Sequence, residues 1–92
     1  MTNQPSSPAT LFQARLETTL SLSRETSEHL RLTLKASGLQ VLALHGKTDA
    51  ALMRDTERNQ QALRDCETRM AALEAHLAAL DRKMADDEEG EA

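Results

Sequence analysis

The stretch HLRLTLKASGLQVLALHG, residues 29–46, is the richest apolar segment of this 92-residue chain. Its leucines alternate with other residues as they would in a β-strand, and a strand hairpin here would need a turn at Ala36-Ser37-Gly38. Alanine is a poor turn residue, whereas the frequent threonines and serines lower the helix propensity. Whether this stretch forms strands or part of a helix decides the fold.

A longer window favours the helix, because a heptad spacing of alternating four and three residues runs through four cycles. In the first half of the chain this repeat comprises Leu16, Leu20, Ser23, Ser27, Leu30, Leu34, Ser37, Val41 and Leu44. In the second half it comprises Leu52, Thr56, Asn59, Leu63, Cys66, Met70, Leu73, Leu77, Leu80 and Met84. The sequence therefore predicts helices over residues 10–45 and 49–85, and strands over residues 29–45 remain the alternative.

The two heptad repeats mirror each other about a predicted turn at residues 46–48. Gly46 suits the end of one helix, and Thr48 or Asp49 suits the cap of the next. Facing positions of antiparallel helices have residue numbers that add up to a constant, and these repeats satisfy that condition. The predicted pairs include Leu16 with Leu77, Ser27 with Cys66, Leu34 with Asn59, and Val41 with Leu52. The pattern predicts an all-α fold, an antiparallel two-helix hairpin of the coiled-coil type.

Charged residues beside this predicted core either favour or disfavour the antiparallel pairing of the two helices. Arg24 and Arg31 are expected among Glu67 and Glu74, whereas Glu17 would lie unfavourably near Asp81. A parallel pairing of residues 49–85 with the same segment of a second copy is a competing arrangement. It would bring Arg69 to Glu74, and His76 to Asp81, of the other chain. Both arrangements are open at this point, and both lead to an oligomer.

A second packing surface is expected on the first helix, because its predicted core is weakened by serines and its opposite side also carries leucines. Small residues on the second helix offer a surface on which another helix can approach closely. The predicted protein-interface residues are Leu11, Leu22, Leu32, Leu39, Leu42, Ala71, Ala75 and Ala78. We expect the hairpin to assemble through these positions into a four-helix or larger bundle.

Composition narrows the possible partners and the cellular compartment. The net charge of −4 and the lack of a basic run argue against nucleic acid. No apolar run approaches the roughly 20 residues that cross a bilayer, so membrane insertion is not expected. A single cysteine and the absence of a signal-peptide pattern indicate an intracellular, cytoplasmic protein. Residues 1–9 are expected to form a disordered leader, and residues 86–92 a disordered acidic tail.

The chemistry-bearing residues do not form a recognisable site. His29, His45, His76 and Cys66 lack the spacing of metal ligands, and Cys66 falls in the predicted core. Gly46-Lys47-Thr48 lacks the remainder of a phosphate-binding loop. The sequence thus predicts no catalytic residue, no metal site and no cofactor.

The function expected from these observations is that of a non-enzymatic structural or adaptor subunit. It would join a homo-oligomer or a multi-subunit complex by helix packing with protein partners. The alternative is a small helical chaperone or regulator that sequesters an amphipathic segment of a partner protein.

Overall fold

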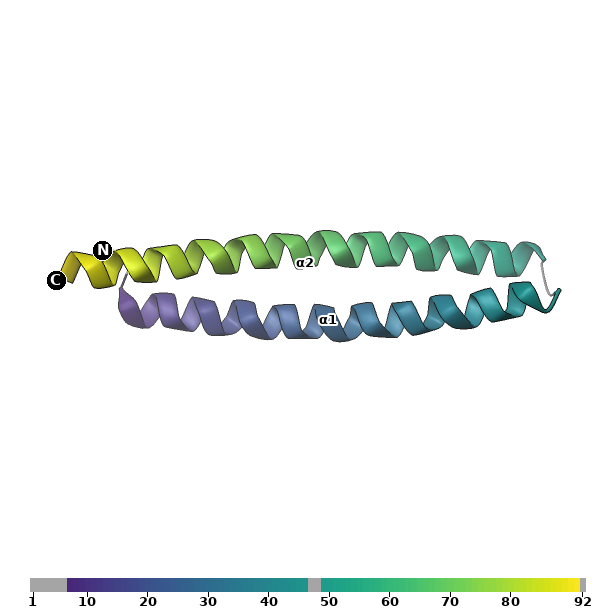
Figure 1. Ribbon diagram of the computed structural model, residues 1–92, viewed down its shortest axis with the longest axis horizontal. Coiled ribbons are helices and arrows are strands. Elements are labelled where there is room, and N and C mark those ends of the chain that lie inside the picture. Colours follow the sequence, from purple (N-terminus) through teal and green to yellow (C-terminus); the bar gives the residue numbers. More distant parts are fainter. Residues whose placement is uncertain (1–6, 47–48, 92) are drawn as a thin grey trace, which may run out of the picture.

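The chain folds into two long helices that lie antiparallel along their whole shared length (Figure 1). The computed structural model describes residues 7–46 and 49–91, with side chains as far as Asp87. Helix α1 spans Pro8–Leu44 and helix α2 spans Ala50–Glu91. The predicted all-α hairpin is therefore confirmed. Because each helix has one helical neighbour, each keeps a long side that the other helix does not cover.

Residues 29–44 belong to α1 without interruption, so the strand alternative for this stretch is wrong. The alternating leucines instead occupy two opposite sides of one helix, since successive residues lie about 100° apart around the axis. Within the described residues, neither helix contains an apolar stretch long enough to cross a membrane.

Ser7 and Pro8 define where α1 begins. The Ser7 hydroxyl accepts a hydrogen bond from the backbone N–H of Thr10 at 3.2 Å, and Pro8 follows in the first turn. Proline suits this position because the N–H that it lacks would have no partner inside the helix. The helix thus starts inside residues 1–9, for which a disordered leader is expected, and residues 1–6 lie outside the described part of the chain.

The turn between the helices depends on Gly46 and Asp49. Gly46 has a φ of 79°, a left-handed conformation that costs glycine little, and its N–H donates to the carbonyl of Ala43 at 3.1 Å. The Asp49 carboxylate accepts from the backbone N–H of Leu52 at 2.8 Å and so caps α2. Asp49 is therefore the cap that the sequence offered, whereas Thr48 lies outside the described residues.

Helix α2 continues beyond the expected end at residue 85. Its backbone stays helical through Glu91, so the acidic segment forms the last turns of α2 as far as the structure describes it. The run of like charges is what predicts a disordered tail, and acidic residues are also unfavourable near a helix C-terminus. Glutamate, a good helix former, nonetheless makes up three of the six residues from Asp86 to Glu91, and the segment contains no proline that would end the helix earlier.

Helix α2 packs through the face that its heptad repeat predicts. Leu52, Asn59, Cys66 and Leu80 are all buried, with relative exposures of 9%, 3%, 0% and 6%. Leu63, Met70, Leu73 and Leu77 are half-buried beside them. The second half of the predicted repeat is thus the core-facing side of its helix.

Helix α1 packs through the side opposite to the predicted one. Its buried residues are Leu11, Thr18 and Leu32, which do not belong to the predicted repeat. Asn59 contacts Leu32 where Leu34 is predicted, and Cys66 contacts Glu25 where Ser27 is predicted. A displacement of two residues along α1 corresponds to a rotation of about 200°, so the predicted facing of this helix is wrong.

Polar pairs across the hairpin stabilise this orientation of α1. Arg15 Nε lies 2.6 Å from Asp81 Oδ1, whereas the predicted facing would bring Glu17 towards the same carboxylate. Arg69 pairs with Glu25 at 3.0 Å, and His29 Nε2 lies 3.0 Å from a carboxylate oxygen of Glu67. Each exposed pair contributes little, but three of them act in the same direction.

Candidate functional site

The predicted interface residues occupy three different environments. Leu11 and Leu32 are 2% and 4% exposed because α2 already covers them. Leu22 and Leu39 are half-buried on the same side of α1, and Leu42 is 45% exposed. On α2 the three predicted alanines are exposed, namely Ala71, Ala75 and Ala78. The hairpin core therefore includes Leu11, Leu22, Leu32 and Leu39. These four leucines do not form a free surface on the single chain.

The free apolar surface of α1 is the heptad repeat that was predicted to face α2. We call it the outer stripe, and it consists of six large aliphatic residues interrupted by Ser23, Ser27 and Ser37. Its aliphatic members are 45–77% exposed: Leu16 45%, Leu20 50%, Leu30 59%, Leu34 64%, Val41 51% and Leu44 77%. Phe12, which is 60% exposed, precedes the stripe by one turn.

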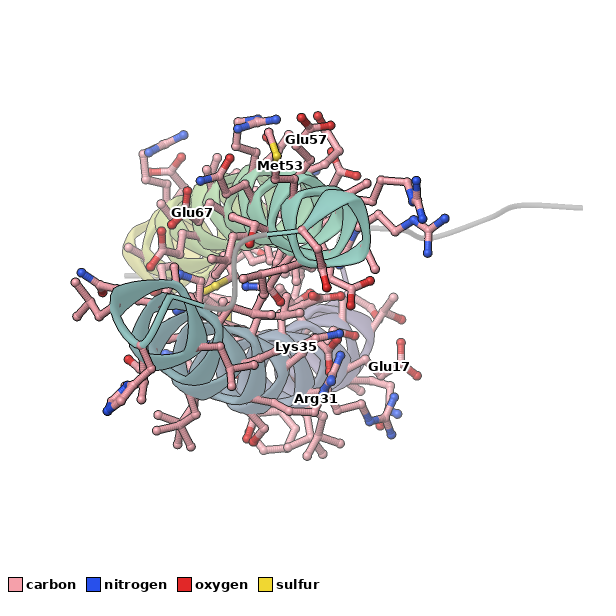
Figure 2. All side chains as sticks on the ribbon, turned by 90° about the vertical axis from the view of Figure 1, so that its right-hand side faces the viewer. Glu17, Arg31, Lys35, Met53, Glu57 and Glu67 are labelled. Atoms are coloured by element: carbon pink, nitrogen blue, oxygen red, sulfur yellow. The ribbon has the colours of Figure 1, made fainter. Side chains whose placement is uncertain are left out.

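The size of the outer stripe distinguishes it from scattered exposed leucines. Together with Phe12, its six aliphatic residues expose on the order of 700 Å² in total along one side of the helix. This area is close to the ~800 Å² that each partner contributes to a standard protein interface. Within the described part of α2, Met53 is the one large hydrophobic residue exposed to this degree, and it points away from α1 (Figure 2).

Threonines follow the outer stripe along one edge. The hydroxyls of Thr19, Thr26 and Thr33 each donate to a backbone carbonyl four residues earlier, at 2.8–2.9 Å. Ser37, inside the stripe, makes the same type of bond to the carbonyl of Thr33 at 3.4 Å. These hydroxyls already have acceptors, so covering them with another apolar surface leaves no donor unsatisfied.

The opposite edge of the outer stripe is charged. Arg24 and Arg31 lie along it, and Arg31 pairs with Glu28 of its own helix at 2.6 Å. The predicted position of Arg31 among Glu67 and Glu74 is therefore not observed. The Glu28 carboxylate raises the pKa of the Arg31 guanidinium, and the hydrogen bond from Arg31 lowers the pKa of Glu28. The two edges thus differ in character, one neutral and one charged.

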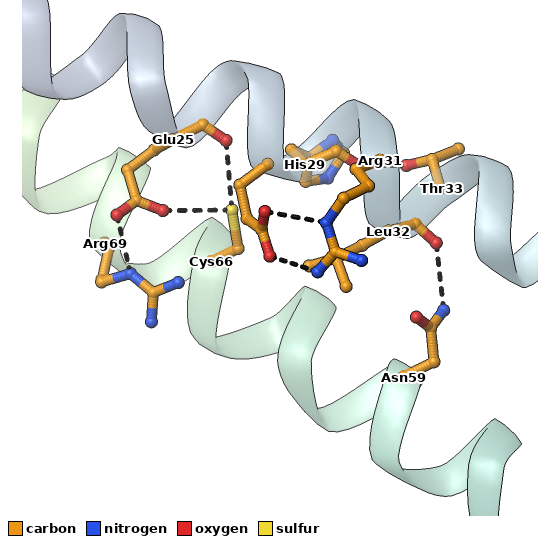
Figure 3. A network of polar contacts seen from close by, with 9 residues as sticks. Glu25, His29, Arg31, Leu32, Thr33, Asn59, Cys66 and Arg69 are labelled. Atoms are coloured by element: carbon orange, nitrogen blue, oxygen red, sulfur yellow. Dashed lines mark hydrogen bonds and ion pairs between the residues drawn. The ribbon is translucent and has the colours of Figure 1, made fainter.

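Polar contacts between the helices concentrate in the middle of the hairpin (Figure 3). The Cys66 thiol lies 3.3 Å from the carbonyl oxygen of Glu25 and 3.4 Å from its Oε1, and the Glu25 carboxylate also accepts from Arg69. Asn59 donates through Nδ2 to the carbonyl of Leu32 at 3.0 Å. These bonds fix the register of α1 against α2 at two layers that the heptad pattern treats as simple core positions.

The protonation of this cluster suits a structural role. The hydrogen bond from Arg69 lowers the pKa of Glu25, so the carboxylate stays charged at neutral pH. Desolvation, reinforced by the neighbouring Glu25, raises the pKa of the Cys66 thiol. A thiol held in its protonated form is a poor nucleophile and a poor metal ligand. Cys66 therefore acts as a small core residue with one weak hydrogen bond.

A shallow groove of about 350 Å³ opens beside Asn59, between the turn-proximal parts of the helices. Its lining is mostly apolar and includes Ala36, Leu39 and Ala43, with polar groups from residues such as Thr56. The Oδ1 atom of Asn59 is buried, and no described residue donates a hydrogen bond to it. This layer of the hairpin core therefore holds a buried acceptor without a donor in the part of the chain that the structure describes.

Neither a metal-binding constellation nor a relationship to a known protein identifies the chain. Within residues 7–46 and 49–91, as far as side chains are described, no three His, Cys, Asp or Glu residues come together as metal ligands would. No protein-family model, no curated protein and no solved structure matches the chain. Among the described residues, the outer stripe of α1 is accordingly the feature that indicates a function most clearly.

Proposed function

We propose that this chain is a non-enzymatic structural subunit that assembles with other polypeptide chains through the outer stripe of α1. The observation that carries the proposal is that α1 is apolar on two opposite sides, of which α2 covers one. A helix with two apolar sides is typically buried between neighbours. The partner is a protein, since the exposed surface is an aliphatic heptad repeat, which packs against another helix.

Two further features support a role in assembly over a catalytic role. The titratable groups at the middle of the hairpin are paired with one another, and Cys66 is a buried, protonated thiol. A free thiol of this kind suits a reducing compartment, and we include a cytoplasmic location in the proposal. An adaptor role within a larger complex would use the same stripe.

A double substitution in the outer stripe tests this function. The variant Leu30→Glu/Leu34→Glu places two charges on the exposed side of α1, and its helix content should stay that of the parent because neither residue is buried by α2. The control is Ala71→Glu/Ala75→Glu, which has the same spacing on the exposed surface of α2. Sedimentation equilibrium should give a 10.1 kDa monomer for the leucine variant and a larger species for the parent and the control.

Two outcomes would contradict the proposal. If the leucine variant has the same mass as an assembled parent, the outer stripe is not the association surface. If the control is the variant that dissociates, the alanine surface of α2 is the interface. A parent that stays monomeric, and gains mass when an amphipathic helical peptide is added, would favour the alternative function of a chaperone or regulator.

A further inference from the structure

We propose that the partner on the outer stripe is a second copy of this chain, with the two α1 helices packed antiparallel about a two-fold axis between Glu28 and His29. This inference rests on the proposed function and specifies its partner. The resulting assembly would contain four helices in the order α2, α1, α1 and α2, because the two apolar sides of α1 lie opposite each other.

Covering both stripes of a dimer favours contact between like surfaces. Each copy carries one outer stripe, so packing stripe on stripe buries both at once. Packing the stripe on α2 of the other copy would instead place leucines on a surface where, within the described residues, Met53 is the one exposed large hydrophobic residue. The stripe and Phe12 together expose on the order of 700 Å², which is close to what one partner contributes to a stable interface.

The three serines select the antiparallel orientation. In a parallel pair each serine would face its own copy, which would give three core layers without an apolar side chain. In the proposed antiparallel register every serine faces a leucine, and small residues opposite large ones interdigitate well. The resulting layers are Ser23 with Leu34, Ser27 with Leu30, Ser37 with Leu20, and Leu16 with Val41.

Sliding the antiparallel pair by one heptad in either direction removes this match. One shift places Ser23 opposite Ser27, and the other places Ser27 opposite Ser37. In the first of these registers Val41 has no partner within the stripe, and in the second Leu16 has none. The proposed register is therefore the one that covers the aliphatic residues from Leu16 to Val41 and keeps an apolar side chain in each of their layers.

The edges of the stripe allow this approach. Along the neutral edge Thr26 would lie beside Thr33 of the other copy, and their hydroxyls already donate to carbonyls of their own helix. Along the charged edge Arg24 would lie beside Arg31 of the other copy. This like-charge contact is moderated because Glu28 is ion-paired with Arg31.

Cross-linking of two single-cysteine variants tests the orientation. In a Cys66→Ala background, Ser27→Cys and Ser37→Cys are treated with a short bismaleimide and separated on a denaturing gel. The two copies of position 27 would lie about 5 Å apart along the helices, and those of position 37 about 25 Å apart. Ser27→Cys should therefore give a covalent dimer, whereas Ser37→Cys should remain a single chain.

The result separates this inference from the proposed function. If both variants cross-link with equal yield, the helices are parallel and the inference is wrong, although assembly through the stripe stands. If the chain assembles and Ser27→Cys does not cross-link, the partner surface or register is different, and the inference is again overturned. If sedimentation of the same samples shows monomers at every concentration, the proposed function fails together with the inference.

Discussion

Replacing Asn59 by leucine should stabilise the hairpin by about 2 kcal/mol, although it removes the hydrogen bond to the Leu32 carbonyl. Asn59 is 3% exposed, and its Oδ1 has no donor among the described residues. Burying a leucine side chain here contributes about 1.5–3 kcal/mol, and removing an unsatisfied acceptor contributes about 1–3 kcal/mol. The lost hydrogen bond and imperfect packing cost about 1 kcal/mol each.

Urea unfolding followed by far-ultraviolet circular dichroism measures this change. The matched control is Gln60→Leu, which makes nearly the same chemical change at the adjacent exposed position and should stay within about 0.5 kcal/mol of the parent. All proteins are compared at one concentration, because assembly makes the apparent stability depend on concentration. In a thermal scan Asn59→Leu should raise the midpoint by roughly 8–16 °C. A lower midpoint than that of the parent would refute the reasoning.

Three further perturbations follow from single contacts. Because Arg69 lowers the pKa of Glu25 in the folded chain, the stability that this carboxylate provides is present above its unfolded pKa of about 4.3 and is lost as the pH falls through the lower folded value. Urea midpoints between pH 6 and pH 2 should therefore fall less steeply for Glu25→Gln, and an equally steep fall would count against the ion pair. Asp49→Ala removes the cap of α2 and should cost about 1 kcal/mol in the same assay, whereas an unchanged midpoint would show that the cap is dispensable. Arg24→Glu turns the proposed Arg24–Arg31 contact between copies into an attractive one, worth about 0.2–1 kcal/mol at each of two symmetric sites, and so should tighten the dimer several-fold by sedimentation equilibrium; a weaker dimer would argue against the antiparallel register.

The sequence allowed the fold and one side of the hairpin to be predicted. The heptad repeat of α2 runs with few interruptions, and it led to Leu52, Asn59, Cys66 and Leu80 as core residues. Gly46 and Asp49 are residue types whose conformational and capping preferences are local, so the turn also followed from the sequence. Each of these features depends on the sequence of a single segment and not on contacts between distant residues.

The facing of α1 could not be predicted by the same reasoning, because this helix has two apolar sides with the same spacing. The choice between them depends on contacts between distant residues, such as Arg15 with Asp81 and Glu25 with Cys66 and Arg69. The charges beside the predicted core did not separate the two sides, because Arg24 and Arg31 were also expected near acidic residues of the second helix. The side richer in leucine was therefore expected inside, and it lies outside as the outer stripe.

The inference of a second surface on α1 does not depend on which side faces α2. Two-sided apolarity leaves one side uncovered in either case, and the structure identifies this side as the one with Leu30 and Leu34. The residues to mutate change accordingly. Glutamate at Leu32 should damage the hairpin itself, since this residue is 4% exposed and lies against α2.

A distance between two copies tests the central claim most directly. A spin label attached through Glu17→Cys in the Cys66→Ala background lies on the exposed part of α1, beside the outer stripe. If two chains pair antiparallel through this stripe, double electron–electron resonance should give a distance of about 35 Å between the labels, from the rise of 1.5 Å per residue. A distance below about 20 Å would show a parallel pair, since the two helix axes would then be about 10 Å apart. The absence of any dipolar coupling at high protein concentration would show that the outer stripe does not bring two copies together.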